Sequence, residues 1–211
     1  MRVIVACESS RVVAEAFAKR GHDAWSCDLL PGETDGNHII GDVMDLDMAS
    51  YDLVIAHPPC THLSVSGARW WKSKLVEQRE AIQFFLWFTN LKNGKIAIEN
   101  PIGLMSTVYR KPDQIIQPWQ FGHPESKSTC LWLFNLPKLS PTNILSKPAS
   151  GRWANQTPSG QNNLPPSEDR WKLRSRTYQG VADAMAEQWG SDGNPRRHVI
   201  PEEEDRAALP G

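Results

Sequence analysis

The sequence predicts an α/β protein built on a mostly parallel sheet, and three features support this class. In the first hundred residues, short apolar runs alternate with longer segments of helical periodicity, the pattern of strands joined by crossover helices. Several of these runs end in polar residues, as strands do where their carboxyl ends form a ligand site. Later segments are rich in Pro, Ser, Asn and Gln, and 138–166 in particular is expected to be loop.

The strands and helices are predicted in order along the chain. Strands are expected at residues 3–6, 23–27, 38–40, 52–56 and 95–98. The first crossover helix is expected at 11–20, where Gly21 follows as a C-terminal cap. A longer helix at 74–91 has apolar residues that could cover a sheet face, namely Val76, Ala81, Phe84, Phe85, Trp87 and Phe88. A last helix is expected from Thr177 or Tyr178 to Trp189.

The composition is that of an ordinary globular chain. Of the 211 residues, 40% are hydrophobic and 22% are charged, and no apolar run approaches the roughly 20 residues that span a bilayer. Since the N-terminus enters a strand directly, without a cationic leader, we expect a soluble cytoplasmic protein. The four cysteines, at 7, 27, 60 and 130, lack CxxC spacing, so neither a disulfide framework nor a metal site is predicted.

The net charge of -1 gives no overall attraction for a polyanion, so contact with nucleic acid would depend on local basic clusters. Basic residues interleaved with tryptophans occur at 69–74 and 170–176, and a further basic pair occurs at 110–111. The candidate DNA-binding residues are Arg69, Lys72, Arg110, Lys111, Arg174 and Arg176. The same clusters could instead be solvated faces with a few half-buried tryptophans.

Polar residues follow the first three strands, at the edge where an open α/β sheet binds its ligands. The residues after the first strand are Cys7, Glu8, Ser9 and Ser10. Asp28, after the second strand, could accept both hydroxyl protons of a ribose diol, and Asp42, after the third, could accept from an adenine amino group. Each aspartate could equally be a cap or a turn residue.

The fourth strand ends in the most informative segment of the chain, His57-Pro58-Pro59-Cys60-Thr61. The two prolines enforce an extended exit from the sheet and place Cys60 at its edge. A thiolate is a strong nucleophile, and we expect a loop at the head of a helix, near backbone N–H groups, to lower the pKa of this thiol. The alternative is that Cys60 is a small apolar residue filling the core, which would need no such mounting.

The fifth strand leads into Glu99-Asn100-Pro101. Consecutive βαβ units are usually neighbours in the sheet, so Glu99 should lie beside the Pro-Pro-Cys segment. Addition of a thiolate to carbon 6 of a pyrimidine moves negative charge toward ring nitrogen 3, where a protonated or hydrogen-bonding carboxyl group stabilises it. A structural alternative is that Glu99 caps a turn before Pro101.

These segments resemble motifs of the cytosine carbon-5 DNA methyltransferase family, in the same order along the chain. Pro58-Pro59-Cys60 and Glu99-Asn100 resemble its nucleophile and carboxylate motifs. The segment 121–129 resembles its Phe-Gly-x-Pro-Gln-x-Arg-x-Arg motif and leads into a strand, with Lys127 at the first arginine and Thr129 at the second. Gln179-Gly180-Val181-Ala182 is similar to its C-terminal motif, which packs back beside the first strand.

The resemblance implies a Rossmann-like S-adenosylmethionine-dependent methyltransferase fold with a mostly parallel central sheet. The implied parts are a catalytic domain at 1–135, a reduced recognition region at 136–173, a returning helix at 174–190 and a flexible tail at 191–211. The implied cofactor is S-adenosylmethionine, and its implied binding residues are Cys7, Glu8, Ser9, Ser10, Asp28, Leu29, Asp42, Val43, Pro58 and Gln179.

The resemblance also implies a reaction on DNA. A cytosine would flip out of the duplex, since carbon 6 is inaccessible within a stack of bases. Cys60 would attack carbon 6, Glu99 would hold nitrogen 3 and the amino group, and Lys127 would meet the base carbonyl or a phosphate. Carbon 5 would take the methyl group, and loss of its proton with expulsion of Cys60 would complete the turnover.

The sequence departs from this family at several positions. The first loop has Glu8, Ser9, Ser10 and Arg11 in place of a glycine-rich segment, and Thr61 replaces a glutamine. The region between Leu136 and Leu173 is much shorter than the usual target-recognition domain. These features resemble the compact methylase-like proteins of bacteriophages, which implies a role in modifying phage DNA. They leave three alternatives open: modification of a free pyrimidine nucleotide, transfer of a group other than methyl, and a catalytically inactive DNA-binding module.

Overall fold

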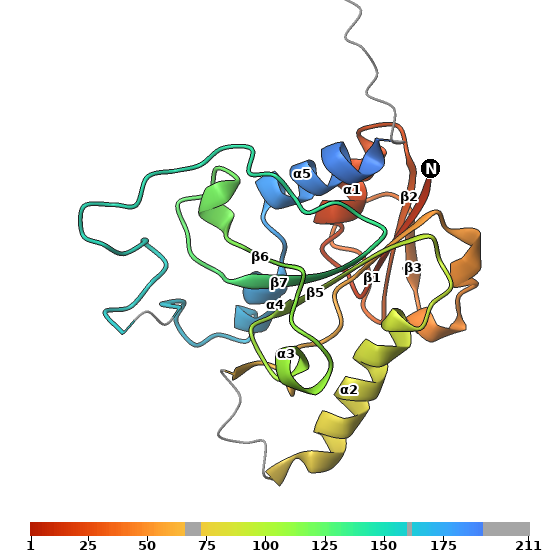
Figure 1. Cartoon of the computed structure of the whole chain (residues 1–211), viewed down its shortest axis with the longest axis horizontal. Coiled ribbons are helices and arrows are strands. Elements are labelled where there is room, and N and C mark those ends of the chain that lie inside the picture. Colours follow the sequence, from red (N-terminus) through yellow and green to blue (C-terminus); the bar gives the residue numbers. More distant parts are fainter. Residues whose placement is uncertain (66–72, 160–161, 192–211) are drawn as a thin grey trace, which may run out of the picture.

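A seven-stranded mixed sheet forms the centre of the protein, in a computed structural model that describes residues 1–65, 73–159 and 162–191 (Figure 1). Its strands are β1 (Arg2–Ala6), β2 (Asp23–Asp28), β3 (His38–Ile40), β4 (Leu53–Ala56), β5 (Lys95–Pro101), β6 (Gln114–Ile116) and β7 (Thr129–Phe134). The strand order is β3-β2-β1-β4-β5-β7-β6, with β1 to β5 parallel and β7 antiparallel to both of its neighbours. The predicted α/β class with a mostly parallel sheet is therefore confirmed, and the architecture is compatible with a Rossmann-like fold.

The strand order also locates the edge at which a ligand should bind. The chain runs outward from β1 to β3 in one direction and from β4 onward in the other, so the order reverses between β1 and β4. In open α/β sheets, the crevice beyond the carboxyl ends of the strands at such a reversal is the usual ligand site. The loop after β1 and the Pro-Pro-Cys segment after β4 both leave the sheet at this point.

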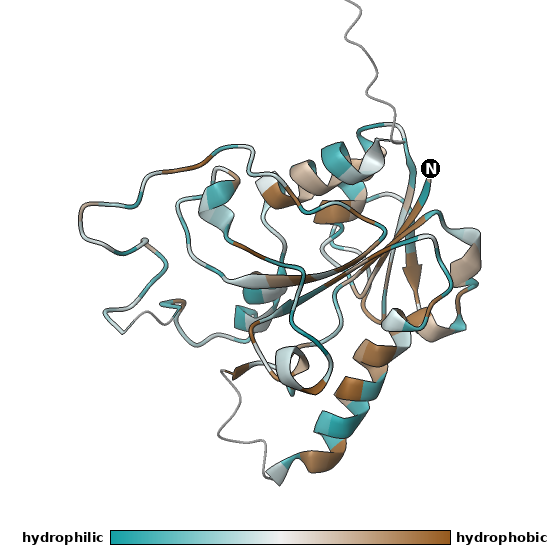
Figure 2. Ribbon diagram, in the orientation of Figure 1, coloured by the Kyte–Doolittle hydropathy of each residue, from teal (hydrophilic) through white to brown (hydrophobic). Residues whose placement is uncertain are grey.

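Helices cover both faces of the sheet. Helices α1 (Val12–Ala18) and α5 (Gln179–Gly190) pack together on one face, although they come from opposite ends of the chain (Figure 1). Helix α2 (Leu75–Thr89) lies on the other face with the short α3 (Met105–Val108), and it carries alternating apolar and polar bands (Figure 2). Helix α4 (Arg170–Ser175) and the 3-10 turns Val43–Asp45, Met48–Ser50 and Pro118–Gln120 complete the described elements.

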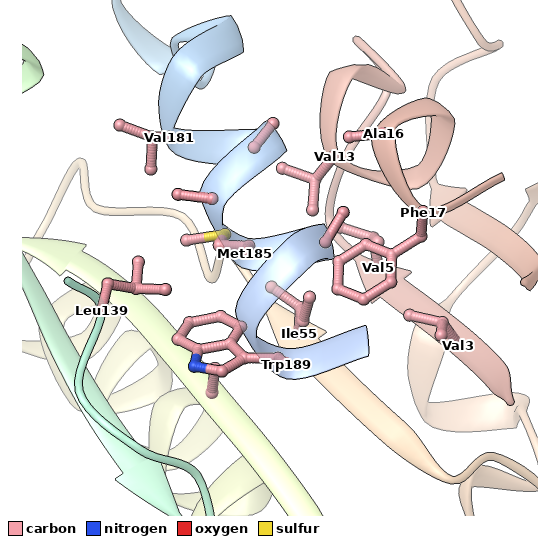
Figure 3. Packing of buried hydrophobic residues seen from close by; sticks show 14 of the residues in the cluster. Val3, Val5, Val13, Ala16, Phe17, Ile55, Leu139, Val181, Met185 and Trp189 are labelled. Carbon is pink, nitrogen blue, oxygen red and sulfur yellow. The ribbon is translucent and has the colours of Figure 1, made fainter. Parts of the chain in front are cut away.

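The packing of α5 against α1 ties the C-terminal segment to the first strand. Phe17 and Trp189 are fully buried in this layer together with Met185, over Val3 and Ile55 of the sheet (Figure 3). The indole Nε1 of Trp189 also donates a hydrogen bond of 2.9 Å to the carbonyl of Pro137, which satisfies the one polar atom of this side chain.

The structure departs from the predicted elements in three respects. Strand β6 and helices α3 and α4 were not expected, and β5 continues through Pro101 instead of ending at Ile98. Val76 does not cover the sheet, because it lies on a projecting turn of α2 and is 65% exposed, whereas Phe85 and Phe88 are buried as expected. Among the described residues, the helices are too short or too polar to serve as a bilayer span.

Candidate active site

The Pro-Pro-Cys segment is held beside β5, as the sequence predicted. Strands β4 and β5 are parallel neighbours, with Ala56 opposite Ile98. Asn100, which is buried, donates a hydrogen bond of 2.8 Å to the carbonyl of Pro58. The carbonyl of Cys60 accepts from the backbone N–H groups of Leu63 and Ser64, so a tight turn follows the cysteine directly. Cys60 is therefore carried by a segment fixed at both of its ends.

Cys60 is a free, exposed thiol at the edge of the sheet, so it is not a core residue. The expected depression of its pKa is wrong. Partial burial of the sulfur, and then the negative charge of Glu99, raise the pKa of the Cys60 thiol above its ordinary value of 9.0. The positive charges of Lys127 and Arg174 oppose this shift, so both cations lie close enough to stabilise a thiolate.

Glu99 lies within β5, where it is paired with Leu131 of β7, and its carboxylate is bound by a residue that sequence reasoning did not select. The imidazole Nδ1 of His57 donates a hydrogen bond of 2.9 Å to Oε2 of Glu99, and the two side chains are 11% and 14% exposed. Burial alone would raise the pKa of Glu99, but the hydrogen bond and charge of His57, with Lys127, lower it below 4.5. Where His57 is protonated and Glu99 is ionised, the two form an ion pair that is largely shielded from water.

His57 could have been found by counting from the register of the sheet. Ala56 lies opposite Ile98 in the β4–β5 ladder, and the residues that follow them are His57, directly after β4, and Glu99 of β5. Burial alone would lower the pKa of His57, but the hydrogen bond and charge of Glu99, with the charge of Glu8, raise it above 6.5. The sequence contained this pair, but the register that aligns it was not known.

A pocket adjoins Glu99 on the side of β7 and α5. It contains about 320 Å³ of space not occupied by atoms, a volume that includes open solvent. The lining residues are Glu99, Ile116, Pro118, Lys127, Thr129, Thr177, Tyr178, Val181 and Met185. Lys127 and Thr129, the positions matched to the two family arginines, thus share a pocket with Glu99. Within the described residues, Cys60 is not part of this lining.

The start of α5 fits closely against the segment before Lys127. The backbone N–H of Gly180 donates to Nε2 of His123 at 2.9 Å, and a Cβ on Gly180 would lie 2.0 Å from the carbonyl oxygen of Phe121. Gln179 instead donates to Asp183 within α5, at the exposed surface. Two segments of the family resemblance, at 121–129 and 179–182, are therefore in direct contact.

We expect Gly180→Ala to lower the free energy of unfolding by about 3 kcal/mol, because α5 would have to move away from Phe121 to admit the methyl group. Urea denaturation measures the effect. Gly94→Ala is the matched control, since a Cβ on Gly94 would have no neighbour within 4 Å. Equal stability of the two variants would contradict the tight packing described for Gly180.

The first loop contains a buried acid that caps a helix. Glu8 is 5% exposed, and its two carboxylate oxygens accept from the backbone N–H groups of Val13 and Ala14 at 2.8 and 3.2 Å. Burial raises the pKa of Glu8, although His57 and these hydrogen bonds act against the shift. The structure thus gives Glu8 a defined role at the N-terminus of α1, where a negative charge also complements the helix dipole.

Arg11, at the end of the same loop, is a buried cation that organises the segment 32–36. It is 3% exposed, and its guanidinium donates to the carbonyl and hydroxyl of Thr34 at 3.0 Å and to the carbonyl of Asp35. A Cβ on Gly36 would overlap this guanidinium. In the sequence, the sign of this arrangement is the presence of Gly32 and Gly36, which leave room for the Arg11 side chain.

The remaining predicted cofactor residues lie along the carboxyl edge of β1 to β3. Asp28 and Asp42 both act on the thiol of Cys7, whose pKa is raised by burial and then by Asp28, so these three residues are close together. One oxygen of Asp28 accepts from the N–H of Leu30, and one oxygen of Asp42 accepts from the N–H of Met44. Leu29 is 74% exposed at this edge, whereas Val43 and Pro58 are buried. Ser9 and Ser10 are half-buried.

The predicted DNA-binding residues are in different environments. Arg174 is exposed on α4 and acts on Cys60, and Lys111 is exposed beyond α3. Arg110 is held in an ion pair with Asp113 at 2.8 Å, and Arg176 is in an ion pair with Glu33. Arg69 and Lys72 lie outside the described residues.

The buried ion pair predicts a pH dependence of stability. The stabilisation that goes with the raised pKa of His57 is fully present below about pH 6.5. It is lost as the pH rises through the pKa of His57 in the folded state. The stabilisation that goes with the lowered pKa of Glu99 is fully present above about pH 4.5. It is lost as the pH falls through the pKa of Glu99 in the folded state. The pair should therefore contribute most between these two values.

We expect the loss of unfolding free energy caused by His57→Asn to be larger at pH 5.5 than at pH 8.5. The raised pKa of Glu8 acts in the same sense as that of His57, because its stabilisation is also lost as the pH rises, so the variant is compared with the wild type at each pH. Urea titrations at both pH values supply the comparison. A penalty that does not change with pH would show that the pair is not ionic.

No protein-family model matches this chain, and no curated protein matches it either. Across the part of the chain that the structure describes, His, Cys, Asp and Glu side chains form no group of three placed to hold a metal ion.

Proposed function

We propose that this protein is an S-adenosylmethionine-dependent methyltransferase that modifies carbon 5 of cytosine in DNA through a covalent adduct with Cys60. One observation carries the proposal. Glu99 and Lys127 line one pocket, and the charges of both act on the exposed thiol of Cys60. A nucleophile, a hydrogen-bonding acid and a cation thus converge beside a pocket that is partly open to solvent.

The proposed chemistry uses each of these groups once. The sulfur of Cys60 adds to carbon 6, and the electron density displaced toward nitrogen 3 is stabilised by a hydrogen bond to Glu99. Lys127 lies 5.9 Å from the ring centre of Tyr178 and is available to the base carbonyl or to an adjacent phosphate. Once carbon 5 carries the new methyl group, removal of its proton and expulsion of the Cys60 sulfur restore the aromatic ring.

The carboxyl edge of β1 to β3 fits S-adenosylmethionine, which supplies an electrophilic methyl group when bound. Asp28 uses one carboxylate oxygen for the N–H of Leu30, and among the described residues its second oxygen has no hydrogen-bond partner. That oxygen is available to a ribose diol. Exposed Leu29 offers an apolar contact next to it. Glu8 would act indirectly, by fixing the start of α1.

The exposed cations around Cys60 favour a polyanionic substrate. Arg174 on α4 acts on the thiol, and Lys172 and Trp171 on the same short helix are also exposed. Phosphates that flank a flipped cytosine would lie within reach of this basic surface. The described part of the region 136–173 is mainly loop, apart from the start of α4, which fits limited reading of base sequence.

Transfer of tritium from labelled S-adenosylmethionine tests the proposal, with duplex DNA, single-stranded DNA and deoxycytidine monophosphate as substrates. We expect label in DNA, located at carbon 5 of cytosine by bisulfite or nanopore sequencing of plasmid from expressing cells. Label in the free nucleotide alone would replace DNA by a nucleotide substrate. Binding of DNA without any transfer, or without binding of the cofactor in calorimetry, would indicate an inactive DNA-binding module.

A further inference from the structure

A largely buried imidazole, that of His57, is bonded to one carboxylate and feels the charge of a second, where the candidate cofactor edge meets the candidate base pocket. His57 is bonded to Glu99 of β5, and it also feels the charges of Glu8, from the loop after β1, and of Lys127, from the loop before β7. Its Nε2 atom is buried and, among the described residues, has no hydrogen-bond partner. The family resemblance assigns no role to His57.

The charges around His57 favour its imidazolium form. A neutral imidazole would leave the Glu99 carboxylate, which is largely removed from water, without a cationic hydrogen-bond donor. Glu8 adds a second acid nearby, and its oxygens are already occupied by the start of α1. Lys127 opposes the imidazolium, but it lies on the pocket side, where its ammonium contacts the carbonyl of Arg176 at 3.4 Å.

We infer that His57 is a positioning residue for the proposed reaction, which holds Glu99 as an anion with Oε2 occupied and leaves its other oxygen for the base. This inference rests on the proposed function. His57, directly before the Pro-Pro-Cys segment, fixes both the orientation and the charge of Glu99. The carboxylate motif alone does neither.

An anionic Glu99 determines which form of the base is held in the adduct. An ionised carboxylate only accepts hydrogen bonds, so it favours cytosine with a proton on nitrogen 3. The sulfur lone pair of Cys60 forms the bond to carbon 6, and the π pair of the carbon 5–carbon 6 bond moves through carbon 4 to neutralise the charge at nitrogen 3. The proton lost by the Cys60 thiol to water balances the proton that nitrogen 3 takes from water.

Titration of the wild-type protein tests the ion pair without any assay of activity. With 13C-labelled glutamate carboxyls and 15N-labelled histidine, NMR should show Glu99 still ionised below pH 4.5 and His57 still protonated above pH 6.5, with signals assigned by Glu99→Gln and His57→Asn. In His57→Asn, which keeps an N–H donor but removes the charge, Glu99 should titrate at least one pH unit higher than in the wild type. His22→Asn, in the turn between α1 and β2 beside Gly190, should leave the Glu99 titration unchanged.

The pH profile of methyl transfer tests the role in the reaction. We expect kcat/KM of His57→Asn, relative to that of the wild type, to be severalfold lower at pH 5 than at pH 8, because Glu99 then loses its charge over the acidic range. Parallel pH profiles, or an unchanged Glu99 titration in the variant, would overturn the inference. Absence of transfer by the wild type would overturn the proposed function instead, and the NMR titration would still decide whether His57 controls Glu99.

Discussion

Replacement of Cys60 by alanine is expected to reduce methyl transfer by at least about 10⁴-fold, because no other group can form the bond to carbon 6. The fold should be retained, since Cys60 is exposed and its truncation leaves no core cavity. Single-turnover transfer of tritium measures the activity, and a thermal melt checks the fold. Thr61→Ala is the matched control, because it truncates the next exposed residue of the same segment and leaves the thiol in place.

The same experiment has a covalent readout. DNA that contains 5-fluorocytosine should trap the wild-type protein and Thr61→Ala as a species shifted on a denaturing gel, because fluorine cannot leave carbon 5 as a proton does. Cys60→Ala should give no such species. Appreciable transfer by Cys60→Ala, or trapping that does not depend on Cys60, would contradict the covalent mechanism.

Glu99→Gln is expected to slow the chemical step by about 10²–10⁴-fold while changing DNA affinity little, because the amide retains the shape of the side chain but not its charge. Presteady-state transfer and a DNA titration separate the two effects. Glu77→Gln, at the exposed start of α2, removes the same charge far from the pocket and should be neutral. A loss of DNA affinity that accounts for the whole defect would assign Glu99 to binding and not to chemistry.

The sheet was predictable because its strands are nearly continuous apolar runs. In β1 and β4 almost every residue is buried, which is the pattern of a parallel strand covered on both faces. Helices α3 and α4 have four and six residues, too few to show a helical period, and their stability must come from tertiary contacts. The extension of β5 through Pro101 was hidden because the polar residues Glu99 and Asn100 end the apolar run at Ile98.

The positions of the site residues were more predictable than their states. Cys60 and Glu99 come together as expected from neighbouring strands, and Lys127 lies in the pocket beside Glu99. The pKa of Cys60 was misjudged because the helix-head argument omitted the partial burial of the sulfur and, after it, the negative charge of Glu99. The His57–Glu99 pair could not be predicted because it depends on the register between β4 and β5. A hydrophobic pattern determines which face of the sheet a side chain lies on, but not which residues lie opposite each other.

The antiparallel pairing of β5 with β7 continues through Glu99 to Pro101, so the acid belongs to a hydrogen-bonded ladder and not to a loop. A ligand that meets such a side chain finds it preorganised and loses little entropy in ordering it. The long connection between β7 and α4 leaves the sheet beyond this ladder (Figure 1). Under the proposed function, segments grafted into that connection would alter which duplexes are engaged while Glu99 keeps its place in the ladder.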